Sequence, residues 1–258
     1  MIINIIKCKT ALSNSNLPGL DYSLNPYRGC QHNCCYCYVP NVLKIDRQKW
    51  GNFVEIKKNI PNILSKELRR KKSGIVGIST VTDPYQPVEK KYNLTRFCLE
   101  QLLIHDFPVH IQTKSDLIKK DEDIISKFTK IELMFSIGTI NDNERKILEP
   151  NSSSIKNRLK TIKFFSDIGI KTSVFFGPIY PTIKKEDLSD IINTFIEYGA
   201  KEIMVDKFNL KPGIKDILKE KIPNSLENIE NKFFFKETYN EINSICNKKN
   251  IKSDLAFN

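Results

Sequence analysis

Three segments near the middle of the chain carry the pattern that decides the fold: KIELMFSI at 130–137, IKNRLKTIKFFSDI at 155–168 and KTSVFF at 171–176. In the first segment apolar residues occupy every second position, which is typical of a β-strand. In the second they recur every three or four positions, and Ser152 to Ser154 before it supply an N-cap. The third segment is short and contains β-branched and aromatic residues, which are typical of a strand. The pattern predicts a strand, a helix and a second strand, the repeating unit of a parallel sheet.

The same alternation extends in both directions from this unit. We expect a first extended segment at 20–29, followed by strands and helices that together make six βα units. The sequence therefore predicts an α/β fold, a partial (β/α)6 TIM-type barrel with parallel strands. The expected strands are 74–80, 108–113 and 201–205, and the expected helices are 62–72, 94–105, 116–128 and 186–198.

One domain is expected over residues 1–258, with a barrel core at about 20–210 and a C-terminal helical extension at 211–258 that includes a helix at 234–248. No linker rich in Pro, Gly or Ser divides the chain. In barrels of this kind the chemistry lies at the C-terminal ends of the strands, because the loops there vary freely. Candidate residues are therefore sought directly after each strand.

Composition is that of a folded and basic protein. Of 258 residues 40% are hydrophobic, and 41 Lys and Arg against 30 Asp and Glu give a net charge of +11. This charge favours a polyanionic partner such as nucleic acid, although a plain basic surface has the same composition. The compact basic run is Arg69 to Lys72. The chain has no apolar stretch of membrane-spanning length, so a cytoplasmic protein with reduced cysteines is expected.

The segment NPYRGCQHNCCYCY at 25–38 contains four of the seven cysteines. Cys30, Cys34 and Cys37 have the spacing C-x3-C-x2-C. Three thiolates in a tight loop can bind three corners of an iron-sulfur cube and leave one iron open. Two alternatives remain: a zinc site completed by His32 or Cys35, and a fully ligated cluster that only carries electrons.

This segment resembles the signature of radical S-adenosylmethionine enzymes, with Tyr36 at the aromatic position of the motif. Tyr38 continues it as in the branch that contains spore photoproduct lyase, and the resemblance extends from about Tyr22 to Asn209. It implies a [4Fe-4S] cluster and S-adenosylmethionine (SAM) as cofactors, reductive cleavage of SAM and a 5′-deoxyadenosyl radical. It also implies an electron donor such as flavodoxin or ferredoxin. Such cofactors carry the chemistry while the protein positions the reactants.

The resemblance assigns further roles residue by residue. Cofactor contacts are expected from Tyr36, Thr80, Lys114, Ser136 and Gly177: Tyr36 against the adenine, Lys114 on the SAM carboxylate and Gly177 where backbone approaches the adenosyl group. Catalytic roles are expected for Tyr38, as a radical relay or a loop brace, and for Asp83. Each position also has a plain structural interpretation, such as a ring packed inside the loop or an exposed lysine.

Thr80 marks a departure from the DNA-repair lyases. It stands where they carry a cysteine that returns a hydrogen atom to the product radical, and an O–H bond is much stronger than an S–H bond. Repair of a DNA photoproduct is therefore doubtful, and the substrate is left open. The alternative from another class is a non-catalytic nucleic-acid-binding protein stabilised by a metal. Cys35 has no assigned role.

Overall fold

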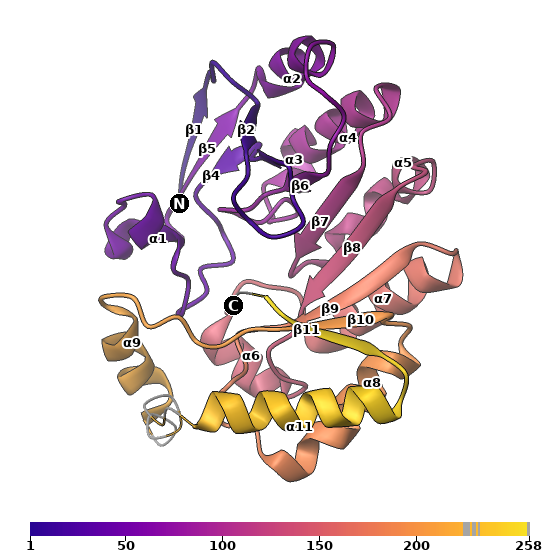
Figure 1. Ribbon diagram of the computed structural model, residues 1–258. Helices are drawn as coiled ribbons and strands as arrows, with labels where there is room; N and C mark the ends of the chain where they lie inside the picture. Colours follow the sequence, from indigo (N-terminus) through magenta and orange to yellow (C-terminus); the bar gives the residue numbers. More distant parts are fainter. Residues whose placement is uncertain (224–227, 229–230, 232, 257–258) are drawn as a thin grey trace. The chain divides into compact units, whose positions relative to one another are not determined.

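The computed structural model describes residues 1–223, 228, 231 and 233–256 (Figure 1). These residues form two compact units. The first consists of Met1–Asn33 and Gln48–Met134, and the second of Cys34–Arg47 and the described part of Phe135–Asn258. The chain passes from one unit to the other after Asn33, after Arg47 and after Met134, and the first of these points falls inside the cysteine segment. Each unit is described by itself.

The first unit contains one half of a mostly parallel sheet. Its strands are β2 (Leu12–Asn14), β3 (Tyr22–Leu24), β6 (Val76–Ile78), β7 (Val109–Thr113) and the start of β8 (Ile131–Ser136), in that order across the sheet. Strands β3, β6 and β7 pair in parallel, and β2 is antiparallel to β3. The register aligns Leu24, Ile78 and Ile111, all of which are buried. Helices α2 (Ile60–Leu68) and α4 (Leu94–Ile104) pack on each other.

A second, small sheet in this unit leads into the cysteine segment. It has the order β1 (Ile2–Ile6), β5 (Phe53–Lys57) and β4 (Tyr27–Arg28), with β1 parallel and β4 antiparallel to β5. This sheet was not expected from the sequence. The short helices of the unit are α3 (Glu89–Tyr92), the 3-10 helix η2 (Asp116–Asp121) and α5 (Glu122–Ile125). The helix expected at 116–128 is thus a 3-10 segment followed by a single α-helical turn.

The second unit contains the other half of the parallel sheet. The end of β8 is followed by β9 (Lys171–Phe176), β10 (Glu202–Val205) and β11 (Lys252–Leu255), and β9, β10 and β11 pair in parallel. Helix α7 (Ile155–Asp167) packs on β9, and α11 (Phe234–Lys248) packs along α8 (Leu188–Glu197), as Figure 1 shows. The remaining helices are α1 (Val39–Val42), η1 (Arg47–Lys49, which begins in this unit), α6 (Asp142–Leu148), η3 (Lys185–Asp187) and α9 (Ile214–Lys221).

The predicted alternation of strands and helices is confirmed. Ser154 caps α7 by accepting a hydrogen bond from the Asn157 N–H, and Gly169 follows the helix with a positive φ of 85°. The C-terminal segment expected to be helical also contains the strand β11, whose sequence Lys-Ser-Asp-Leu gives no apolar alternation. Within the described residues, no helix has the length and apolar character needed to cross a membrane.

Candidate active site

The three cysteines of the motif lie in the loop between β4 and α1. Cys30 is buried and belongs to the first unit, while Cys34 and Cys37 are half-buried and belong to the second. All seven cysteines of the chain are thiols. Gly29, directly before Cys30, has a φ of 90°, and a Cβ there would lie 2.4 Å from the Phe53 carbonyl oxygen. Only glycine therefore permits this approach of the loop to β5.

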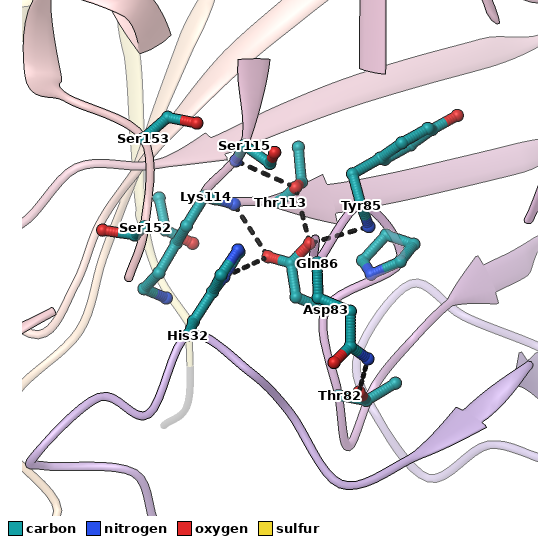
Figure 2. A network of polar contacts seen from close by, with 12 residues as sticks. His32, Thr82, Asp83, Tyr85, Gln86, Thr113, Lys114, Ser115, Ser152 and Ser153 are labelled. Carbon is teal, nitrogen blue, oxygen red and sulfur yellow. Dashed lines mark hydrogen bonds and ion pairs between the residues drawn. The ribbon is translucent and has the colours of Figure 1, made fainter. Parts of the chain in front are cut away.

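Asp83 is the centre of a polar network in the first unit (Figure 2). Its Oδ1 accepts hydrogen bonds from the Tyr85 N–H at 2.9 Å and from the Thr113 hydroxyl at 2.8 Å. Its Oδ2 accepts the Lys114 backbone N–H at 2.9 Å and lies 3.3 Å from His32 Nδ1. One carboxylate thus joins the loop after β6, the end of β7 and the residue two positions after Cys30.

The environment of Asp83 keeps its carboxylate ionised. Burial alone raises the pKa of Asp83, but the nearby His32 and the hydrogen bonds from Lys114 and Thr113 outweigh burial and lower the pKa to about 2. His32 and Asp83 are both buried. Because its oxygens are engaged by four partners, Asp83 is suited to hold loops in place. Its expected catalytic role remains a prediction.

Two other predicted residues of the first unit lie close to this network. Thr80 is half-buried, and its hydroxyl accepts a hydrogen bond from the Asn25 side chain at 3.3 Å. Lys114 is half-buried, and the contact to Asp83 uses its backbone rather than its ammonium group. The structure therefore brings Lys114 and Asp83 together at the C-terminal ends of β6 and β7, as the sequence analysis expected for strand-end residues.

Tyr36 is the centre of a second network, in the second unit. Its hydroxyl donates a hydrogen bond to the Glu149 carboxylate. Its ring makes edge contacts with Tyr180 and Phe208, at centroid distances of 6.1 and 5.6 Å. Burial and the neighbouring Glu149 raise the pKa of Tyr36 well above its ordinary value, so the phenol stays protonated.

Glu149 also forms an ion pair with Arg158, and both side chains are buried. Arg158 donates to the Ser136 carbonyl at 2.7 Å and to the Ser153 carbonyl at 2.9 Å. Burial disfavours the guanidinium charge, but the Glu149 carboxylate outweighs burial and raises the pKa of Arg158. The cysteine loop is therefore connected through Glu149 and Arg158 to Ser136 at the end of β8. Ser136 itself is buried.

The other predicted positions of the second unit are Gly177 and Tyr38, and both have close contacts within this unit. A Cβ at Gly177 would lie 2.4 Å from the Phe175 ring and 2.9 Å from the Asp206 Cβ. Asp206 directly follows β10, and burial raises its pKa to about 6 against the opposing effect of Lys207. Tyr38 is the residue before α1, and its carbonyl accepts the Asn41 N–H at 3.0 Å.

Cys35 connects the loop to α6. Its N–H donates to the Leu148 carbonyl at 2.8 Å and its thiol to the Ile147 carbonyl at 3.4 Å. Burial raises the pKa of this thiol, which keeps it protonated. These contacts give Cys35 a structural role in holding the loop against α6.

Sequence reasoning missed His32, Glu149 and Arg158. The sequence suggests His32 only as a zinc ligand, whereas its neighbour in the structure is the carboxylate of Asp83, 51 positions later in the chain. Arg158 gave a detectable signal, because it lies three positions after Ile155 on the apolar face of α7, where a charged residue needs a buried partner. Glu149 gave none.

The residues present fit the cofactors expected from the sequence. Three thiols at C-x3-C-x2-C are the donor set of an iron-sulfur cube with one open iron. In the second unit, among the described residues, the buried hydroxyl of Tyr180 has no hydrogen-bond partner, as expected where a polar ligand completes a site. Within the same described residues, no three His, Cys, Asp or Glu side chains are grouped to hold a single metal ion.

Comparison with known proteins identifies a family. Residues 24–195 match the model of the Radical SAM superfamily. An uncharacterized protein of Methanocaldococcus jannaschii is 34% identical over 250 residues, which cover 95% of this chain and 93% of that protein. An uncharacterized protein of Acidianus two-tailed virus is 31% identical over 198 residues, which cover 70% of this chain and 65% of the viral protein.

Solved structures show the same fold. A spore photoproduct lyase variant with bound AdoMet and dinucleoside spore photoproduct is 14% identical, with a TM-score of 0.76 over 99% of this chain and 82% of the lyase. The SuiB protein of Streptococcus suis bound to S-adenosylmethionine is 16% identical, with a TM-score of 0.63 over 90% of this chain and 49% of SuiB. The expected α/β fold with a mostly parallel sheet is therefore confirmed and matches a partial barrel.

Proposed function

The chain belongs to the radical SAM superfamily of enzymes, and we propose that it cleaves S-adenosylmethionine reductively to start a radical reaction on its substrate. Membership implies a [4Fe-4S] cluster, SAM and an electron donor. It favours an enzyme over the non-catalytic binding protein considered from the sequence. The observation that carries the proposal is the spacing of Cys30, Cys34 and Cys37 inside a chain with this fold.

Cys30, Cys34 and Cys37 would hold the cluster. When bound, the cluster and SAM supply an electron and a 5′-deoxyadenosyl radical able to abstract hydrogen from a substrate. The protein must then fix the thiolates, bind the polar groups of SAM and keep water away. Two contacts support the first of these tasks, because they fix the loop on both sides of Asn33. His32 lies beside the buried Asp83, and Tyr36 donates a hydrogen bond to the buried Glu149.

The residues that the resemblance assigns to the cofactor would bind and orient SAM. The ammonium group of Lys114 would pair with the SAM carboxylate, an interaction strengthened at a half-buried position. Ser136 and Gly177 would contact the adenosyl part, with Arg158 fixing the backbone at Ser136. Tyr36 would contact the adenine. Asp83 would hold Thr113 and the Lys114 backbone in the position that this binding requires.

Nucleic acid is the substrate class that the charge supports. The chain has a net charge of +11, and Arg69 to Lys72 follow α2 as a compact basic run in which Arg69, Arg70 and Lys72 are exposed. The Lys71 ammonium group lies 4.9 Å from the centre of the Tyr22 ring. Phosphate groups of a polynucleotide would neutralise such a run.

Lyase activity on a DNA photoproduct is the second candidate, favoured by the fold shared with spore photoproduct lyase. Thr80 stands against it, because the O–H bond of a threonine hydroxyl is too strong for the hydroxyl to give up a hydrogen atom to the product radical. An assay with a dinucleoside photoproduct separates the two: repair to the free dinucleoside would support the lyase. Failure to repair it, together with cleavage of SAM, would favour another nucleic-acid substrate.

Anaerobic reconstitution tests the proposed function. We expect about four irons and four sulfides per chain and a paramagnetic reduced state whose spectrum changes when SAM is added. Substitution of Cys30, Cys34 or Cys37 by alanine should abolish that change, whereas C98A, at a buried cysteine of α4, should retain it. Zinc without sulfide in protein purified free of oxygen would contradict the proposal.

A further inference from the structure

We propose that Gln86 is a positioning residue that holds the backbone on both sides of Cys30. The inference rests on the proposed function, because it assumes that Cys30 is a cluster ligand. Gln86 is in the loop between β6 and α3, 56 positions after Cys30 in the chain. The cysteine motif does not include it, and its amide forms hydrogen bonds with Gln31, Gly29 and Thr82.

The side-chain amide of Gln86 contacts the two residues that flank Cys30. Its Oε1 accepts a hydrogen bond from the Gln31 N–H at 2.9 Å. Its Nε2 donates to the Gly29 carbonyl at 3.3 Å and to the Thr82 hydroxyl at 3.0 Å. One planar amide therefore pairs with an acceptor before Cys30 and a donor after it, as a neighbouring strand would.

Two further contacts and one backbone torsion angle support this arrangement. The Thr82 hydroxyl donates to the same Gly29 carbonyl at 2.6 Å. In return, the Gln31 side-chain oxygen accepts the Val88 N–H at 2.5 Å, so the two glutamines fix the two loops reciprocally. Gly29 has a φ of 90°, which glycine adopts readily, and the hydrogen bonds from Gln86 and Thr82 to its carbonyl select this conformation among those open to glycine.

Burial makes the loss of any of these hydrogen bonds costly in free energy. Gln86 is fully buried and Cys30 is 9% exposed, so water cannot replace a lost partner at low cost. The site requires both halves of the amide, since a carboxylate offers no donor to Gly29 and an ammonium group offers no acceptor to Gln31. The geometry thus fixes the Cys30 backbone before any cluster binds, which reduces the ordering cost of binding.

Two substitutions separate the halves of the amide. Q86M preserves approximate size but removes both hydrogen-bonding groups, and Q86E retains an acceptor for Gln31 while removing the donor to Gly29. The matched control is Q101M, at a half-buried position on α4. Far-ultraviolet circular dichroism establishes that each variant is folded. If Q86M does not fold, the iron release from Q86E described below decides the test.

The first measurement uses the full-length chain without cluster. Amide hydrogen exchange at Gln31 should be about fivefold or more faster in Q86M than in the wild type, and close to wild type in Q86E and Q101M. Unchanged exchange at Gln31 in folded Q86M would overturn the inference. Because this readout needs no cofactor, it does not depend on the proposed function.

The second measurement uses reconstituted protein. Release of iron to a chelator should be about tenfold faster from Q86M than from the wild type, intermediate from Q86E and unchanged in Q101M. Equal release from Q86M and the wild type would overturn the positioning role. If the wild type itself assembles no four-iron cluster, the proposed function fails instead, and the exchange result still decides the contacts of Gln86.

Discussion

Asp83 shows how one buried carboxylate joins three segments of the first unit. It receives two backbone N–H groups and a hydroxyl, and it lies beside His32. We expect D83N to lower the free energy of unfolding by ~2 to 4 kcal/mol, because the three donors are shared between both carboxylate oxygens and an amide offers only one oxygen as acceptor. Urea unfolding of the cofactor-free chain measures this change. D123N, at an exposed carboxylate, is the matched control and should change stability much less.

The pKa of Asp83 also predicts how this difference depends on pH. A folded-state pKa of about 2 lies below the ordinary value of about 3.9, so the stabilisation is present above pH ~4 and is lost as the pH falls through 2. The difference in the free energy of unfolding between the wild type and D83N should therefore become smaller from pH 5 to pH 2. A difference that stays constant over this range would contradict the assigned ionisation.

Asp206 gives the opposite pH dependence. Burial raises its pKa to about 6, so its contribution to stability is present below pH ~4 and is lost as the pH rises through 6. We expect the free energy of unfolding of D206N to equal that of the wild type near pH 4. At pH 8 it should be larger by ~1 to 2 kcal/mol, after allowance for solvent screening, because an amide carries no charge to bury. Thermal unfolding from pH 4 to 8 measures this. D190N, at an exposed position on α8, is the control, and its stability should change with pH in the same way as that of the wild type.

Among the elements of the second unit, the cysteine loop, α7 and the end of β8 are joined by Glu149 and Arg158. Arg158 is fully buried, so E149Q would leave a buried guanidinium charge without its carboxylate. We expect a loss of ~3 to 5 kcal/mol in the free energy of unfolding. D167N removes the partner of Lys163 in an ion pair whose two side chains are both exposed, and it should cost ~1 kcal/mol or less. A similar cost for both variants, measured by urea unfolding, would show that Glu149 has no special role.

Elements with strong periodicity could be predicted from the sequence, and those without it could not. Strand β9 occupies 171–176 and α11 occupies 234–248, as expected, because each has an uninterrupted pattern. Strands β1 and β11 were missed, since their pairing partners are distant in sequence and their own residues do not alternate. The boundary between the two compact units, after Asn33, has no signal in composition.

The candidate site was predictable only in part, for a related reason. The cysteine motif is local and could be read directly, and strand-end positions such as Lys114 and Ser136 followed from the expected topology. The residues that hold the loop are distant in sequence: Gln86 and Asp83 for its first half, Glu149 and Arg158 for its second. Glutamine, aspartate and glutamate are ordinary surface residues, so their burial becomes evident only in the folded chain.

For the whole molecule, a net charge of +11 predicts salt-sensitive binding to nucleic acid. We expect affinity for a single-stranded oligonucleotide to fall linearly with salt on logarithmic axes, by a slope of about 0.7 for each neutralised phosphate. Replacing Arg69, Arg70, Lys71 and Lys72 by glutamine should reduce this slope by about two to three. The control replaces four exposed lysines elsewhere: Lys156, Lys160, Lys248 and Lys249. Binding that does not change with salt would favour a peptide or a small molecule as substrate.

Release of 5′-deoxyadenosine under anaerobic conditions tests the account most directly. Reconstituted wild-type protein, supplied with SAM and a strong reductant, should release the nucleoside, and C30A, C34A and C37A should not. C98A is the matched control and should behave as the wild type, since Cys98 is buried within α4. A wild-type protein that assembles about four irons and four sulfides per chain, yet releases no nucleoside above the level of the three variants, would contradict the account.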